Sequence, residues 1–92
     1  MPRYNFDKVI TGLVSVMGQL GDSFPSSHRE IVLELIDNRE YGIALEIICA
    51  VIIHDHIYLP AACLTEIEKM ADTMEMKENK KIAELLNLAT GN

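Results

Sequence analysis

The sequence has 92 residues, of which 49% are hydrophobic and 24% are charged, and its formal net charge is -6. This length predicts a single domain spanning residues 1–92, because a second hydrophobic core would not fit. The acidic balance, with a pI near 4.9, argues against nucleic acid and anionic membranes as partners, since both attract clustered Lys and Arg. It favours a basic protein partner, or simply solubility.

No segment of the sequence predicts a membrane anchor. The longest uncharged stretch, Val9 to Gly21, is shorter than the roughly 20 apolar residues that span a bilayer. Asp7 before it and the helical spacing within it disfavour a cleaved signal peptide. The two cysteines, Cys49 and Cys63, lie in apolar segments, which predicts reduced, buried thiols. We therefore expect a cytoplasmic protein.

The first segment has apolar residues at steps of three and four, which predicts a helix that ends near Leu20. Asn5 or Asp7 is the expected N-cap of this helix. Its expected buried stripe consists of Phe6, Val9, Ile10, Leu13, Val14, Met17 and Leu20.

A loop over residues 21–26 precedes a second predicted helix. Ser27 and Glu30 have the spacing of a capping box, in which each side chain bonds the other residue's amide. The expected buried stripe of this helix is Ile31, Val32, Leu35 and Ile36.

A third helix is predicted from near Tyr41 to the polar run that starts at His54. Its many β-branched residues would also suit a strand, but the sequence offers no second strand to pair with it. The expected buried residues are Ala44, Leu45, Ile48, Val51 and Ile52.

Two further helices are predicted after an extended crossing over residues 57–59. Pro60 suits the first turn of the fourth helix, and Gly91 suits the end of the fifth, which starts at Lys80. Residues 76–79 form a bend between the two helices. The inward residues are expected to be Cys63, Ile67, Met70, Ala71 and Met74, then Ile82, Leu85, Leu86 and Ala89. The predicted fold is all-α: a compact single-domain bundle of about five short helices.

The sequence contains no pattern that predicts catalysis. His54, Asp55 and His56 follow Cys49 by a few residues, but a zinc site needs further ligands and neither a CxxC nor an HExxH pattern supplies them. There is no GxSxG elbow and no glycine-rich phosphate loop. We expect neither an enzyme nor a bound metal or other cofactor.

Acidic residues are concentrated in the middle of the chain. Six of them lie within 26 residues, relieved only by Arg29 and Arg39: Glu30, Glu34, Asp37, Glu40, Glu46 and Asp55. Such a cluster is either a solvated face or a surface that attracts a basic protein by charge complementarity.

One string within this acidic region is distinctive. Glu40-Tyr41-Gly42-Ile43-Ala44-Leu45-Glu46, followed by Cys49, resembles the signature of the MafI family of immunity proteins. These are small helical inhibitors encoded beside polymorphic bacterial toxins, including those of contact-dependent inhibition systems. The resemblance covers roughly residues 30–76. Family members commonly carry an acid after the cysteine, where this chain has Ala50.

The resemblance implies a bacterial, cytoplasmic, non-enzymatic protein that binds a cognate toxin domain and covers its active site. Toxins of this kind are often nucleases, such as EndoU-type ribonucleases, with basic clefts. The expected toxin contacts are Glu34, Asp37, Glu40, Glu46, Asp55 and His56. The alternative is a small helical interaction or self-associating module without a toxin, which would use apolar residues off the main stripe of the third helix: Ile43, Ile47 and Ile53. Whether the chain is a monomer or a homodimer is left open.

Overall fold

The computed structural model describes residues 6–89, and the predicted all-α fold is confirmed. Five α-helices and one 3-10 turn follow one another along the chain, and no strand occurs among the described residues. The elements are α1 (Phe6–Leu20), η1 (Gly21–Ser23), α2 (Ser26–Asp37), α3 (Tyr41–His54), α4 (Ala61–Thr73) and α5 (Lys80–Ala89). The expected positions of Asn5 and Gly91 lie outside the described residues.

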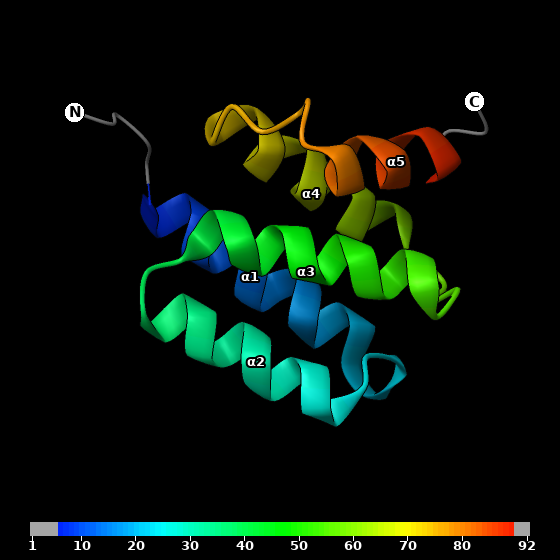
Figure 1. The fold of residues 1–92 in the computed structure, drawn as a ribbon, viewed down its shortest axis with the longest axis horizontal. Helices are drawn as coiled ribbons and strands as arrows, with labels where there is room; N and C mark the ends of the chain where they lie inside the picture. Colours follow the sequence, from blue (N-terminus) through cyan, green and yellow to red (C-terminus); the bar gives the residue numbers. More distant parts are fainter. Residues whose placement is uncertain (1–5, 90–92) are drawn as a thin grey trace.

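Helix α3 packs against three other helices. Helices α2 and α3 form an antiparallel hairpin, α5 lies along α3, and α1 lies behind α3, where it packs against α4 (Figure 1). Leu45 and Ile48 of α3 are fully buried with Leu13 of α1, Ile67 of α4 and Ile82 of α5. All of these side chains belong to one continuous apolar cluster. No helix formed by residues 6–89 is both long and apolar enough to cross a membrane.

Helix α1 buries a slightly different face from the predicted one. Val14 is 54% exposed and Phe6 is 40% exposed, whereas Val16 and Gly12 are buried. A Cβ atom at Gly12 would lie 2.8 Å from the sulfur of Met70. The absence of a side chain at Gly12 therefore lets α4 approach α1 closely, and this approach turns Val14 outward.

Helix α2 does not begin with the predicted capping box. It starts one residue before Ser27, after Pro25, and the side chain of Pro25 makes no capping hydrogen bond. Arg29 instead ties α2 to the end of α1, because its guanidinium donates hydrogen bonds to the carbonyl oxygens of Met17 and Gly21. A cation at this position also complements the negative end of the α1 dipole.

The start of α4 also differs from the prediction, and the cap of α5 was not predicted. Pro60 is the residue before α4 rather than part of its first turn, although its carbonyl accepts the first helical bond, from Leu64. Asn79 caps α5, because its side-chain oxygen accepts hydrogen bonds from the amides of Lys81, at 3.0 Å, and Ile82, at 3.2 Å.

Three helices end in the same way. Arg39 after α2, His56 after α3 and Glu75 after α4 have φ angles of 64°, 53° and 56°. In each case the amide of the next residue bonds back five positions, as from Glu40 to Leu35 at 2.8 Å. These are Schellman motifs, whose left-handed position usually carries glycine. The backbone of each of these three non-glycine residues is therefore in a left-handed conformation that costs about 1–2 kcal/mol.

We predict that Glu75→Gly stabilises the protein by about 0.5–1 kcal/mol. Glycine removes the left-handed strain, and this gain exceeds the about 0.4–1 kcal/mol that glycine costs by freeing the unfolded chain. Chemical denaturation measures the change. Glu68→Gly, at an exposed position inside α4, is the control and should destabilise the protein by about 1 kcal/mol. Equal effects of the two substitutions would contradict this explanation.

Candidate functional site

The hairpin formed by α2 and α3 carries the distinctive string of the sequence. Glu40 ends the turn and Tyr41 starts α3, with its ring 5.3 Å from the ring of Phe6. Gly42 lies beneath Met76, whose sulfur would be 3.0 Å from a Cβ atom there. Ala44 and Leu45 are fully buried. Most of the string therefore builds the hairpin and fixes it to α1 and to the segment after α4.

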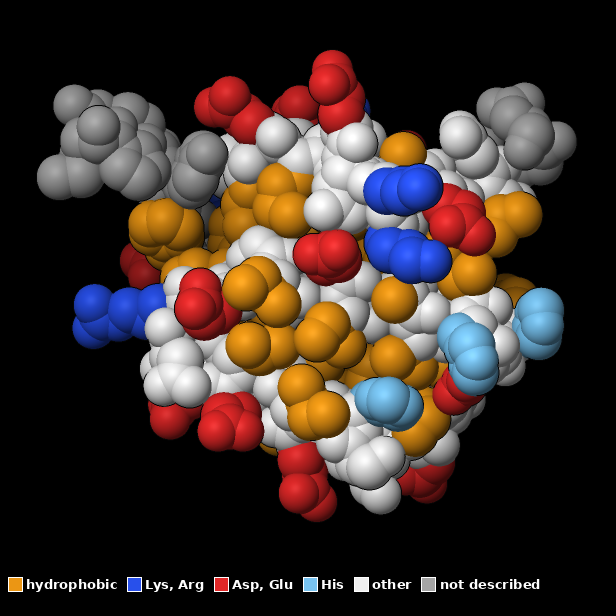
Figure 2. Space-filling model, in the orientation of Figure 1, with side chains coloured by type: hydrophobic (Ala, Val, Ile, Leu, Met, Phe, Trp, Pro, Cys, Tyr) orange, Lys and Arg blue, Asp and Glu red, His pale blue; other side chains and the backbone are white. Residues whose placement is uncertain are grey.

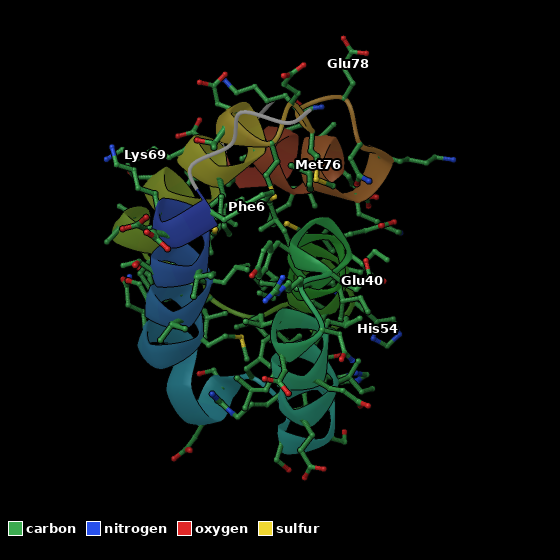
Figure 3. The ribbon with its side chains drawn as sticks, turned by 90° about the vertical axis from the view of Figure 1, so that its left-hand side faces the viewer. Phe6, Glu40, His54, Lys69, Met76 and Glu78 are labelled. Atoms are coloured by element: carbon green, nitrogen blue, oxygen red, sulfur yellow. The ribbon has the colours of Figure 1, made fainter. Side chains whose placement is uncertain are left out.

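Helix α3 is apolar around most of its circumference, but its neighbours do not cover all of it. Ile43, Ile47, Ala50 and His54 are spaced three or four residues apart and so lie on one side of the helix. Ile43 is 46% exposed, Ile47 and Ala50 are half-buried, and His54 is exposed. Glu40 and His54 both lie on the side of α3 turned away from α1 (Figure 3).

Ile31 of α2 extends this apolar surface across the hairpin. It is 44% exposed and lines, together with Ile47, Ala50 and Val51, an open groove of about 530 Å³ between α2 and α3. We call the surface formed by Ile31, Ile43, Ile47 and Ala50 the hairpin face. Figure 2 shows apolar side chains gathered over these two helices. Isolated apolar residues are common on protein surfaces, but a contiguous patch beside a groove is typical of a binding site.

Three predicted contact residues border the hairpin face. Glu34 lies about 60° around α2 from Ile31, Glu40 lies at the turn, and Glu46 borders Ile43 and Ile47 on the side of α5. Glu34 and Glu40 are exposed and Glu46 is half-buried. Among residues 6–89, none of the three carboxylates has an ion-pair partner within 4.0 Å. Their negative charge is therefore available to a partner.

The opposite end of the hairpin face is polar and carries groups of both signs. His28, His54 and Lys81 line the far end of the groove, about 20 Å along α3 from Glu40. The Nδ1 atom of His54 is 2.8 Å from a carboxylate oxygen of Asp55, and Lys81 lies 3.7 Å from Glu84. The turn end of the hairpin face therefore carries carboxylates, whereas the far end combines Lys81 and two histidines with Asp55.

The other three predicted contact residues do not lie on the same surface as Glu34, Glu40 and Glu46. Asp55 lines the far end of the groove, and its carboxylate is within hydrogen-bond distance of His54. Asp37 is exposed but lies about 120° around α2 from Ile31. His56 lines a different hollow, of about 230 Å³, between the end of α3 and α5, and Ile53 lines it too. The six residues therefore do not form one patch.

The apolar spacing predicted that Ile31 is buried in the core, and no sequence pattern predicted Ala50 as part of a binding surface. Val32 is the one buried residue of α2. Ile31 lies at the edge of the contact between α2 and α3, where it stays partly exposed. The available signal was in α3, where Ile43, Ile47 and Ile53 lie off the main stripe and were predicted as candidates for exposed apolar surface. Ile43 confirms that prediction, whereas Ile47 and Ile53 are half-buried.

Both cysteines are free and buried, as predicted. Burial, and to a smaller extent the nearby Glu46 carboxylate, raise the pKa of the Cys49 thiol to about 12. Burial likewise raises the pKa of Cys63, with Glu66 as the second cause. A protonated, buried thiol is a poor nucleophile and a poor metal ligand. In the described part of the chain, no three His, Cys, Asp or Glu side chains are grouped as a metal site.

No protein-family model matches this sequence, and neither does any curated protein or any solved structure. The resemblance of the Glu40–Cys49 string to immunity proteins therefore stays a prediction.

We predict that stability falls above pH 9 partly because of Cys49. The thiol of the unfolded chain loses its proton near pH 9, while the folded state keeps its proton up to about pH 12. Between these values the unfolded state binds fewer protons, so this group lowers the free energy of unfolding by about 1.4 kcal/mol per pH unit. Urea denaturation at several pH values measures the slope. Cys49→Ala should flatten it, and an unchanged slope would contradict the assignment.

Proposed function

We propose that this protein is an immunity protein, which binds a cognate bacterial toxin domain through the hairpin face and covers its active site. One observation carries the proposal: an apolar surface, bordered by unpaired carboxylates, lies on the same hairpin as the string that resembles immunity proteins. Exposed carboxylates beside an apolar centre suit a basic protein partner.

The string divides into two kinds of residue, and this division supports the proposal. Leu45 and Cys49 are buried and hold the hairpin in place. Glu40 and Glu46 point to the surface on either side of the exposed Ile43. A string that both builds a hairpin and places charges around its apolar centre is what a scaffold for binding requires.

The proposed mechanism needs no catalysis by this chain. A nuclease cleft is basic because it holds phosphates, so an acidic surface imitates the charge of the substrate and is drawn to the cleft by long-range attraction. Apolar contacts in the centre then slow dissociation, since affinity among related complexes depends mostly on the dissociation rate. The toxin is inhibited because its substrate and this protein compete for the same cleft.

The exposed apolar residues also favour a second candidate, a self-associating module that buries the hairpin face against another copy. Charge weighs against it, because each copy carries a net charge of -6 and two copies therefore repel each other. Sedimentation at increasing protein concentration decides between the two. A dimer that persists on dilution and is broken by Ile43→Ser would favour self-association.

We predict that this chain rescues bacterial cells that express the toxin domain encoded beside its gene. The measurement is growth after co-expression, with an unrelated acidic helical protein as the control. Binding of the purified pair should also abolish the activity of the toxin in vitro. Failure of the chain to rescue growth, or the absence of any toxin gene beside it, would contradict the proposed function.

We predict that Glu34→Lys with Glu40→Lys slows association with the toxin domain at least tenfold at low salt and flattens its salt dependence. Each reversal adds two positive charges, so the double variant has a net charge of -6 plus 4, or -2. The loss of steering charge acts on the association rate. Stopped-flow fluorescence measures that rate.

The matched control reverses Glu68 of α4 and Glu78 in the loop before α5, both of which are exposed. It has the same net charge of -2. Figure 3 shows Glu78 pointing away from the hairpin. The control should keep a much faster association rate than the hairpin variant. Equal rates for the two variants would show that net charge, rather than the hairpin face, steers the encounter.

A further inference from the structure

The groove in the hairpin face is suited to hold a side chain of a binding partner. Its floor is apolar, formed by Ile31 of α2 and by Ile47 and Val51 of α3. Ala50 lies between Ile47 and His54 along the exposed side of α3 and leaves the space open, because its side chain is a single methyl group. The volume of about 530 Å³ lies within the range of small binding pockets, roughly 300–1,000 Å³.

The charges around the groove are asymmetric. Near the turn, Glu34 and Glu40 are exposed and have no ion-pair partner among residues 6–89. At the far end, Asp55 is bonded to His54 and Lys81 is paired with Glu84. In Figure 2, acidic side chains lie to the left of and below the apolar patch, His side chains lie to its right, and Lys or Arg side chains lie at its upper right and at the far left. A ligand with positive charge on one flank therefore has a preferred direction in the groove.

We propose that the groove binds one large apolar side chain of the partner, with Lys or Arg residues flanking that side chain on the side of the turn. This proposal rests on the proposed function and specifies the part of the toxin domain that docks. A buried apolar anchor within a charged rim is the usual arrangement of a binding hot spot.

Filling the groove tests the proposal. In Ala50→Phe the new side chain occupies the space between α2 and α3, so the partner's anchor no longer enters. We expect binding to the adjacent toxin domain to weaken at least tenfold, through faster dissociation, although the variant makes the surface more apolar. Val14→Phe, on the exposed surface of α1, is the matched control and should bind like the wild type. Surface plasmon resonance gives both rates.

Ile31→Ser keeps the test independent of any folding defect in Ala50→Phe. Ile31 is partly exposed, so its replacement removes one wall of the groove and leaves the fully buried Val32 in place. It should also weaken binding at least tenfold. Thermal unfolding of every variant confirms that the fold is intact.

The outcomes separate the two proposals. If the wild type binds and rescues while Ile31→Ser and any folded Ala50→Phe bind equally well, the groove is not the receptor and the inference is wrong, but the proposed function stands. If the wild type neither binds nor rescues, both fail. A concentration-dependent dimer that Ile31→Ser dissociates would assign the hairpin face to a second copy and overturn the inference.

Discussion

Helix α3 is apolar on almost every side, so other helices must shield it from water in several directions. Its residues Leu45, Ile48 and Ile52 are buried against the other helices, and α1, α2 and α5 are arranged around it. These three helices leave one side of α3 uncovered, because the remaining helix of residues 6–89, α4, packs against α1 and α5 instead. The uncovered strip, with Ile43 and Ile47, becomes the centre of the hairpin face.

This origin explains why the hairpin face is both apolar and held in a fixed position. The strip belongs to a helix whose opposite side is the core, so its side chains are carried by one of the best-packed elements of the fold. Schellman motifs at both ends of the strip, with Arg39 and His56 in left-handed conformations, set where the hairpin turns and where α3 ends. A rigid surface loses little conformational freedom on binding, which favours affinity.

The helices followed from apolar periodicity, and within residues 6–89 their ends agree with the predicted ones to about two residues. The departures have local causes that periodicity does not encode. Val14 turned outward because Gly12 lets α4 approach α1, and the predicted cap of Ser27 failed because Pro25 starts α2 earlier. The candidate site was predictable only in part. Acidic residues are visible in a sequence, whereas the groove depends on how α2 lies against α3, which determined that Ile31 is exposed.

An NMR titration shows directly which surface of the protein changes on binding. In methyl-labelled protein titrated with the adjacent toxin domain, we expect the signals of Ile31, Ile43 and Ile47 to shift or broaden. The signals of Val14, exposed on α1, and Ile67, buried in α4, should stay in place. Changes concentrated at Val14, with the three hairpin isoleucines unaffected, would contradict the assignment of the hairpin face as the binding surface.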